Sequence, residues 1–554
     1  MPRTCSGVKA SMGLVWSIAL LMCGLSTARA QHSDDSLAVR RIRLEAMDHS
    51  AVIENAFFRP DVFGPRFLAP PAMRQASDWA MQRLRSYGVA KVWREPVPPP
   101  IEVGPGLLWS GTGWSVDRFA IQQLTPHHAV LIGHPVMLSA STSGREQGDA
   151  FVLLLPDAFA AVNNPNDSTW SEFFVRNRGR LRGKILLIGP AVEPAASIVA
   201  PLDLERPEAF HRYTSQDLAA IAQRPASTSV PHLLGPPPGF SLDRFLAAQD
   251  RLFGFLRAEG VVALLRPAQG ANGTIVVGGP LVAGDPRVTP PATIELAAEH
   301  YNRLVRLAEH GVPARIEVEL VTRAHPGEGV FNTLGELPGS SKAHEVIMIG
   351  AHLDSQHIGT GATDNAVSCA ILMEAVRILR TLDLRLERTV RIALWGGEEA
   401  GYLGSRSYVQ THFGKPTGEA ASEYANFSGY LNLDAGAGQI RGIYVNGIDS
   451  LIPIFRQWLA PFTDWEATTV SLRDRRGSDY DQFVDVGLPG LPFIQDPLDY
   501  FAVTHHSNMD VLDHVLPYEQ DIKRSAAIVA WIIYKAANAP SRLPRRPRAG
   551  SPGN

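Results

Sequence analysis

The pattern of apolar and polar positions changes character twice along this chain. From residue 36 to residue 97 the spacing is helical, and the stretch ASDWAMQRLRSYGV predicts an amphipathic helix that closes at Gly88. Between residues 118 and 290, short apolar runs such as HAVLIG, AFVLLLP and GKILLIG alternate with loops. Such short runs separated by turn residues are typical of strands, so residues 118–290 are predicted to form an inserted β-rich domain.

Residues 291–538 follow a different order, in which near-continuous apolar strands alternate with helices. Predicted strands lie in HEVIMIGAHLDS, TVRIALWGG and GYLNLDAG, and predicted helices in NAVSCAILMEAVRILRTL and EEAGYLGSRSYVQTH. This order predicts an α/β fold with a mainly parallel mixed sheet flanked by helices on both faces. The basic, proline-rich residues 539–554 are predicted to be a disordered tail.

The N-terminus has the pattern of an export signal. Arg3 and Lys9 precede an apolar run from Gly13 to Leu25, and a small-x-small cleavage site ends at Ala30. We therefore expect residues 1–30 to be a signal peptide, with the mature chain periplasmic or extracellular. No other apolar run reaches the roughly 20 residues of a membrane span, so no transmembrane segment is expected in the mature chain.

Charge and cysteine content exclude several classes of function and of metal site. The 554 residues carry a formal net charge of -3, which gives no electrostatic basis for binding nucleic acid. Of the three cysteines only Cys369 follows the predicted signal, so neither an internal disulfide nor a thiolate metal site is expected.

Candidate chemistry is concentrated in five polar clusters at the ends of predicted strands or before predicted helices. Taken singly, each has a structural explanation: an aspartate can cap a helix, and acidic residues suit a helix N-terminus. In an open sheet, however, the carboxyl ends of the strands gather at one edge, where ligands bind. The clusters are His352 with Asp354, Asp364, Glu398 with Glu399, Asp434, and the loop containing His505, His506 and Asp510.

Three or more carboxylates in one pocket would repel each other strongly unless a cation neutralised them. Histidine nitrogen and carboxylate oxygen are ligands that suit zinc, and two such ions close together form a hydrolytic centre. In that setting one glutamate of the 398–399 pair would bind a metal, while its neighbour would take a proton from the attacking water.

At this level of detail the chain resembles the M28 family of di-zinc metallopeptidases, notably its secreted bacterial members. The segments HLDS, GATDNA, GGEEAGYLGS, NLDAG and HHSNMD occur in the order and at the spacing of that family. The resemblance implies a peptidase domain whose N-terminal part is residues 31–117 and whose catalytic part is residues 291–538. Residues 118–290 resemble a protease-associated (PA) domain inserted between them.

The resemblance also implies roles for individual residues. His352 and Asp434 would hold one Zn²⁺, Glu399 and His506 would hold the other, and Asp364 would bridge the two ions. Glu398 would be the general base, and Asp354 would orient His352 through its second ring nitrogen. His505 would line the pocket, and Tyr500 and Tyr480 are candidate donors to the developing oxyanion.

The function expected is an exported di-zinc exopeptidase, an aminopeptidase or dipeptidase acting on peptide or dipeptide substrates. A carboxypeptidase of the same family is the nearest alternative. A glutaminyl-cyclase-like acyltransferase with one zinc and a non-catalytic binding protein on the same fold are alternatives from other classes. The sequence leaves open a homodimer, the side-chain preference, and the use of another divalent metal such as cobalt or manganese.

Overall fold

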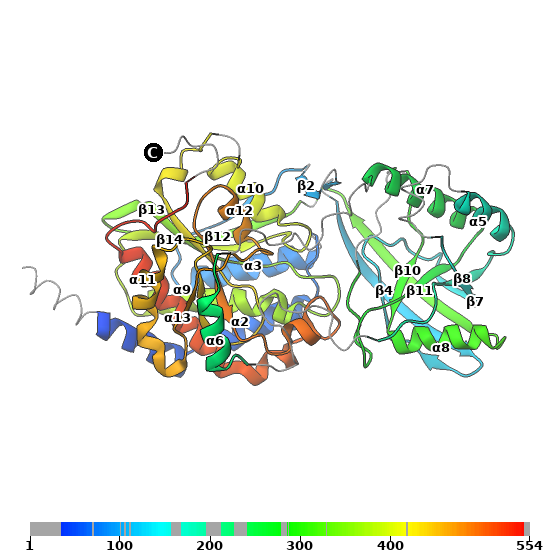
Figure 1. Cartoon of the computed structure of the whole chain (residues 1–554), viewed down its shortest axis with the longest axis horizontal. Helices are drawn as coiled ribbons and strands as arrows, with labels where there is room; N and C mark the ends of the chain where they lie inside the picture. The colour runs from blue at the N-terminus through cyan, green and yellow to red at the C-terminus, as the bar shows by residue number, and fades with distance from the viewer. Residues whose placement is uncertain are drawn as a thin grey trace, which may run out of the picture.

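The structure, a computed structural model, describes residues 35–68, 71–99, 101–104, 107–109, 112–156, 168–194, 212–226, 241–278, 285, 287–327, 329–416 and 419–547. The predicted signal peptide lies outside these ranges. Two eight-stranded sheets each organise one domain, and the two domains lie side by side along the long axis of the molecule (Figure 1).

The first domain is built on a mixed sheet of order β1-β12-β14-β13-β15-β18-β16-β17. Its central strands β14, β13, β15 and β18 run parallel to one another. Every residue of β14 is buried, as expected for an apolar strand covered on both faces. The predicted mainly parallel mixed sheet is therefore confirmed. The strands are β1 (Lys91–Pro96), β12 (Phe331–Leu337), β13 (Lys342–His352), β14 (Arg388–Trp395), β15 (Phe427–Asn432), β16 (Ile440–Tyr444), β17 (Thr469–Ser471) and β18 (Gly490–Gln495).

Helices cover both faces of this sheet (Figure 1). On one face a large apolar core includes side chains of α2 (Val52–Phe57), α3 (Pro71–Ser86), α9 (Val367–Thr381), α11 (Leu451–Leu459) and α13 (Glu519–Asn538). On the other face α10 (Leu403–His412) and α12 (Tyr480–Asp485) enclose a smaller aromatic core, in which the rings of Tyr430 and Phe483 stack at 4.2 Å.

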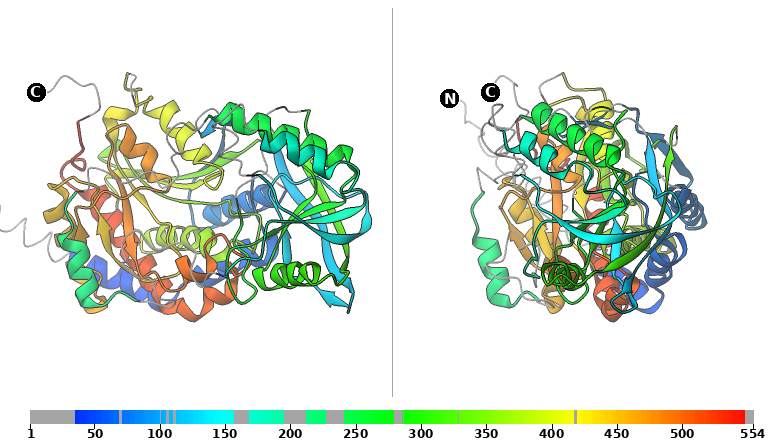
Figure 2. Two further views of the ribbon diagram at one scale, coloured as in Figure 1. Left: turned by 45° about the vertical axis from the view of Figure 1, so that its right-hand side comes forward. Right: turned by 90° about the vertical axis from the view of Figure 1, so that its right-hand side faces the viewer.

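The second domain is also a layered α/β unit (Figure 2). Its sheet has the order β5-β4-β11-β7-β8-β9-β10-β6, with β7, β8, β9 and β10 parallel. Helices α5 (Thr169–Asn177) and α7 (Leu242–Ala258) pack on one face, and α8 (Ala298–Glu309) packs on the other. The strands are β4 (Gly113–Thr125), β5 (Ala129–Val130), β6 (Gly133–Pro135), β7 (Arg145–Leu153), β8 (Lys184–Ile188), β9 (Ala263–Pro267), β10 (Thr293–Leu296) and β11 (Arg315–His325).

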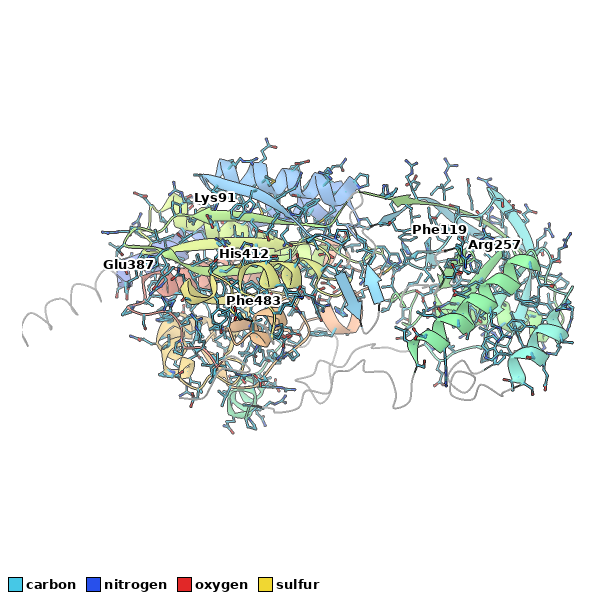
Figure 3. All side chains as sticks on the ribbon, turned by 90° about the horizontal axis from the view of Figure 1, so that it is seen from above. Lys91, Phe119, Arg257, Glu387, His412 and Phe483 are labelled. Carbon is cyan, nitrogen blue, oxygen red and sulfur yellow. The ribbon has the colours of Figure 1, made fainter. Side chains whose placement is uncertain are left out.

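A further helix runs over residues 35–48, and the remaining elements are shorter. They are β2 (Ile101–Gly104), β3 (Leu107–Trp109), η1 (Phe58–Phe63), η2 (Ala362–Ala366), η3 (Tyr424–Asn426), η4 (Ala460–Trp465), η5 (Tyr500–Thr504), η6 (Leu512–His514), η7 (Leu516–Tyr518) and α6 (Ser215–Gln223). Figure 3 separates the two domains clearly: His412 and Phe483 lie in the first, and Phe119 and Arg257 lie in the second.

Two predicted boundaries are wrong. The sheet of the second domain extends from β4 to β11, so the limit at residue 118 falls inside β4, and β10, α8 and β11 do not belong to the first domain. A strand–helix–strand order at residues 293–325 looks the same in either sheet, which is why the sequence pattern misassigned it. Three helices also pack on the sheet of this domain, which was predicted to be β-rich. Its identity as a PA domain stays a prediction.

Residues 91–96 and the C-terminal tail also differ from expectation. Residues 91–96 are an edge strand and not helix, because β1 pairs antiparallel with β12. The predicted disordered tail is ordered as far as the structure describes it: Leu543 is buried, and Arg545 donates to the carbonyl of Phe427 at 2.7 Å. Within the residues described, no helix combines the length and apolar character needed to cross a membrane.

Candidate metal centre

The candidate ligands meet at the carboxyl ends of three adjacent parallel strands. His352 ends β13, Glu398 and Glu399 follow β14, and Asp434 follows β15. Because β14, β13 and β15 are neighbours in the sheet, these side chains emerge at one edge although they are far apart in sequence. Asp364 and His506 reach the same edge from η2 and from the loop after η5.

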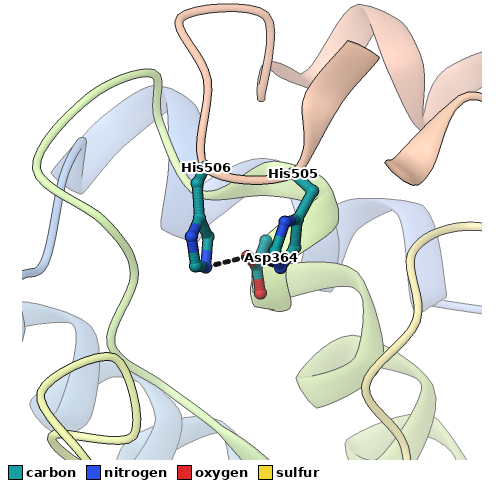
Figure 4. Close-up of side chains that lie close together, drawn as sticks. All are labelled: Asp364, His505 and His506. Carbon is teal, nitrogen blue, oxygen red and sulfur yellow. Dashed lines mark ion pairs between the residues drawn. The ribbon is translucent and has the colours of Figure 1, made fainter. Parts of the chain in front are cut away.

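Asp364 lies between two histidines and offers one carboxylate oxygen to each. Its Oδ1 is 3.1 Å from His352 Nε2. Its Oδ2 is 3.4 Å from His506 Nε2 (Figure 4). His352 Nε2 is also 3.3 Å from Asp434 Oδ1, and His506 Nε2 is 3.0 Å from Glu399 Oε2. The arrangement therefore has two halves that share Asp364.

The two glutamates stand in a turn, not in the first turn of a helix. Strand β14 ends at Trp395, two glycines follow, and α10 begins only at Leu403. Gly397 has φ +72°, and a Cβ on Gly396 would lie 2.4 Å from the carbonyl oxygen of Phe331, so both positions require glycine. The helix-start explanation of the acidic pair is thereby excluded.

Asp354 holds this turn in place. Its carboxylate accepts hydrogen bonds from the backbone N–H groups of Glu398 (3.2 Å) and Glu399 (3.3 Å). His352 Nδ1 is 3.1 Å from the backbone carbonyl oxygen of Asp354 and 3.6 Å from its carboxylate. Asp354 thus contacts His352 as predicted, and it also fixes the backbone from which the glutamate side chains project.

Two further side chains position ligands. Gln356 Nε2 donates to Glu399 Oε2 at 2.8 Å, and Ser478 Oγ donates to Asp434 Oδ2 at 2.6 Å. Ser478 also accepts from Asn432 Nδ2 at 3.2 Å, and Asn432 Oδ1 accepts from the Tyr430 hydroxyl at 2.6 Å. A chain of hydrogen bonds thus runs from the aromatic core to Asp434.

Electrostatic coupling within the cluster is strong because the groups are buried together. Burial lowers the pKa of His352, but the carboxylates of Asp434 and Glu398 outweigh burial and hold that pKa well above the usual value. Burial raises the pKa of Glu398 well above its usual value, and the carboxylates of Asp434 and Asp479 raise it further. A proton or a cation must therefore compensate the negative charge here.

The side chains present fit divalent metal ions. Three overlapping groups have candidate ligand atoms that all lie within 4.8 Å of one another. Asp364 Oδ2 and Glu399 Oε1 are buried without a hydrogen-bond partner, although buried carboxylate oxygens are normally paired. The groups are Asp364 with His505 and His506, His352 with Glu398 and Asp434, and His352 with Asp364 and Glu399.

His505 is less favourably placed as a ligand than His506. Its ring stacks on that of His506, with centroids 3.8 Å apart, and its Nε2 is 3.9 Å from Asp364 Oδ2 (Figure 4). The ring of Tyr500 packs edge-on against His505 at 5.1 Å. The carboxylates of Asp364 and Asp434 act with burial to raise the pKa of Tyr500 well above its usual value, so this hydroxyl stays protonated beside the cluster.

The remaining predicted residue is Tyr480, the first residue of α12. Its side chain packs in the smaller aromatic core with Phe483 and Trp395. His357, a buried residue without a predicted role, lines a cavity of about 430 Å³ at the junction of the two domains.

Sequence reasoning missed four residues that support the cluster: Gln356, Ser478, Asp479 and Arg66. Ser478 and Asp479 lie in GSDYD, where an adjacent serine and aspartate after a strand could have drawn attention. Arg66 is fully buried and donates to the carbonyls of Leu353 (2.7 Å) and Gly361 (3.0 Å), which flank the loop between His352 and Asp364. No local pattern marks it.

Comparisons with known proteins agree with this geometry. Residues 332–532 match the sequence model of Peptidase family M28. Human carboxypeptidase Q is 29% identical over 262 residues, which cover 47% of this chain and 52% of that protein; the chain thus spans about half the length of the curated relatives it matches. An aminopeptidase of Pseudomonas aeruginosa (strain UCBPP-PA14) is 40% identical over 92 residues, 16% of this chain and 15% of that one.

Among solved structures, a Peptidase M28 precursor from Shewanella amazonensis SB2B has a TM-score of 0.60 at 21% identity. The similarity covers 93% of this chain and 99% of that one. At this identity the match establishes the fold, which extends over both domains.

Proposed function

Because residues 332–532 match the sequence model of Peptidase family M28, we propose that this chain is a zinc exopeptidase that cleaves peptide bonds near a chain terminus. The observation that carries the proposal is the group of histidines and carboxylates in which the buried Asp364 faces the buried His352 on one side and the half-buried His506 on the other. The comparatively free Glu398, in the same pocket, supplies the acid–base group that hydrolysis requires.

Two zinc ions would be held in the two halves of the cluster. His352 and Asp434 form one half, Glu399 and His506 form the other, and Asp364 belongs to both. Zinc bound there would act as a Lewis acid toward the scissile carbonyl and would lower the pKa of the attacking water. The absence of thiolates among these ligands suits a catalytic site rather than a closed structural one.

The protein's own groups then carry out the proton transfers. A carboxylate oxygen of Glu398 takes the proton from the attacking water and delivers it to the leaving nitrogen. The pKa of Glu398, which burial and its acidic neighbours raise, makes this carboxylate a competent base. The Tyr500 hydroxyl, which stays protonated, is placed to donate to the oxyanion as the carbonyl becomes tetrahedral.

The choice of substrate terminus rests on the relatives that the chain resembles. An aminopeptidase of Pseudomonas aeruginosa (strain UCBPP-PA14) shares 40% identity with this chain over 92 residues. Asp479 offers no charge to a substrate terminus, because it is fully buried and burial raises its pKa well above the usual value. We therefore favour an aminopeptidase or dipeptidase; a carboxypeptidase is the second candidate, because another curated relative is carboxypeptidase Q.

The test is hydrolysis of an aminoacyl-p-nitroanilide by the zinc-loaded protein, compared with its N-acetylated form and with an N-blocked dipeptide that has a free carboxylate. Cleavage of the first alone supports the aminopeptidase, and cleavage of the last alone supports the carboxypeptidase. If neither these substrates nor an unblocked dipeptide is cleaved at two zinc per chain, the exopeptidase proposal is wrong and a non-catalytic binding role replaces it. Full activity at one zinc per chain would overturn the two-zinc mechanism.

Export is part of the proposal and rests on the N-terminal sequence. A basic start, an apolar stretch and the Ala28-Arg29-Ala30 site support cleavage near Ala30. N-terminal sequencing of the protein from a secreting host checks this: we expect the mature chain to begin near Gln31.

A further inference from the structure

A segment of the second domain lies directly against the loop that carries His506. The N–H of Val277 donates to the carbonyl of His506 at 3.0 Å, and the N–H of Asn508 donates to the carbonyl of Ile275 at 3.0 Å. Val276 and Ser507 form an antiparallel β-bridge between these two contacts. Residues 269–278, which connect β9 to β10, thus act as a short added strand alongside a metal-ligand loop of the first domain.

The side chain of Asn508 closes this contact. Its Oδ1 accepts from the N–H of Ile275 at 2.7 Å, and its Nδ2 donates to the carbonyl of Gly273 at 3.2 Å. Together with its own backbone N–H, Asn508 makes three hydrogen bonds to the segment 269–278. It lies two residues after His506, so any movement of Asn508 is transmitted to the histidine.

The loop needs such external support. His506 has φ +56°, a left-handed conformation that costs a non-glycine residue roughly 1–2 kcal/mol and persists only where the surroundings impose it. Apolar contacts extend the support to a second ligand loop, because Ile275 and Ala297 of the second domain pack with Ile358, which lies between His352 and Asp364.

The segment is in turn held by its own domain. Glu299, in the first turn of α8, accepts from the N–H of Asn272 at 2.6 Å and from the N–H of Gly273 at 3.4 Å. Glu295 of β10 accepts from the N–H of Gly278 at 3.0 Å and pairs with Arg266 of β9 at 3.0 Å. A continuous series of contacts therefore joins the second sheet to His506.

We propose that Asn508 is a positioning residue for His506 and that the second domain, through residues 269–278, sets how tightly metal is held at His506 and Glu399. The inference rests on the proposed metal centre and goes beyond it, because it makes the second domain part of the metal site. Asn508 itself touches neither metal nor substrate.

The test compares Asn508→Ala and Glu299→Ala with the full-length parent, using zinc alone as the probe. Competition with a chromogenic chelator measures the affinity of each zinc. We expect Asn508→Ala to weaken one of two zinc sites by roughly 10–100-fold, the range typical of groups that orient a metal ligand. The kcat of Asn508→Ala should recover as the zinc concentration is raised, while its KM for the substrate should equal that of the parent. Glu299→Ala acts in the same direction, more weakly, from the second domain.

Gln147→Ala is the matched control, because it removes an exposed side-chain amide that hydrogen-bonds Glu317 on the second sheet. It should leave both zinc affinities and the unfolding midpoint unchanged. Parent-like zinc affinity in both Asn508→Ala and Glu299→Ala would overturn the inference while the proposed function stood. If Asn508→Ala does not fold, Glu299→Ala decides alone. A parent protein that binds no zinc would instead overturn the proposed function itself.

Discussion

Glu398 and Glu399 are neighbours in sequence but differ in their contacts, and this difference supports the different roles proposed for them. Glu399 Oε2 contacts His506 and Gln356, whereas Glu398 has His352, Asp434 and Asp479 as its electrostatic neighbours. Glu398→Gln keeps the shape of the side chain but removes the base, so we expect kcat to fall by about 10²–10⁴ with zinc content unchanged. Metal analysis and steady-state kinetics on the same preparation check both halves.

Asp364→Asn is the contrasting variant. Asp364 offers one oxygen toward each histidine, so its loss should release zinc as well as activity. The geometry also groups Glu398 with His352 and Asp434 within ligand distance. If Glu398→Gln loses zinc as readily as Asp364→Asn, Glu398 is a ligand and not the base.

Among individual residues, the sequence predicted the convergence of those that directly follow a strand. His352 and Asp434 directly follow apolar runs that could only be strands, so their convergence was foreseeable. Asn508 and Arg66 were not foreseeable, because each acts through backbone groups of segments hundreds of residues away. Neither the type of residue nor its spacing marks such a contact.

At the scale of elements, the loop from Leu353 to Gly361 is held by the guanidinium group of Arg66, which comes from the N-terminal part of the chain. Arg66 is fully buried and donates to the carbonyls of Leu353, Thr360 and Gly361, and burial lowers its pKa to about 10. Arg66→Met leaves these buried acceptors unpaired, so we expect the free energy of unfolding to fall by about 3–5 kcal/mol.

Urea unfolding measures this, with Arg85→Met as the control. Arg85 is exposed and makes one hydrogen bond to the carbonyl of Val92 at 3.1 Å, so its loss should cost under about 1 kcal/mol. Equal losses in the two variants would contradict the structural role given to Arg66.

Helix α10 is joined to β1 by a titratable contact. His412 Nδ1 is 2.7 Å from Glu423, and Nε2 is 3.2 Å from Glu95. Burial lowers the pKa of His412, but hydrogen bonds to the two carboxylates outweigh it and raise the pKa to about 9. A group whose pKa rises on folding stabilises the protein fully below its unfolded pKa, near 6.5, and loses that contribution as the pH rises through 9.

We therefore expect the unfolding midpoint of the parent to exceed that of His412→Gln at pH 6 and the gap to narrow by pH 9. Thermal unfolding followed by circular dichroism at both pH values, in one ionic strength, measures it. A gap that is constant or widens with pH would show that protonated His412 does not stabilise this contact.

Pattern reasoning located β14 and α9 because their apolar runs are long and continuous. It failed for β1, whose KVWREP sequence shows no alternation of apolar and polar residues, lies soon after a helix, and forms a strand by pairing with β12. It also extended α10 back to the glutamates, because a turn built on two glycines cannot be told from a helix start by polarity alone.

At the scale of the whole molecule, the boundary between the domains depends on which sheet a strand joins, and the sequence does not encode that locally. β10, α8 and β11 have the same apolar pattern as the elements of the first domain, but hydrogen bonds place β10 and β11 in the second sheet and α8 packs on that sheet. The same topology brings residues 269–278 against the loop of His506, so the two domains meet at the proposed metal centre.

The domains are also joined at a second place, by α6. This helix lies between β8 and α7 in sequence, yet it packs on the edge of the first sheet (Figure 1). Leu218 and Ile221 are buried against Tyr444 and Ile494, and Ser471 Oγ donates to the carbonyl of Ile221 at 2.7 Å. Arg212, just before the helix, pairs with Asp521 of α13 at 2.6 Å.

Burying an aliphatic side chain of this size contributes about 1.5–3 kcal/mol, so the double variant Leu218→Asp, Ile221→Asp should undock α6. Hydrogen exchange followed by mass spectrometry should then show amide exchange at residues 215–223 accelerated by about 10²-fold or more. Zinc content should not change, because α6 contacts none of the ligands. Exchange as slow as in the parent would mean that α6 is held by its polar contacts and not by its apolar face. Loss of zinc would mean that the α6 contact is coupled to the contact between residues 269–278 and the His506 loop.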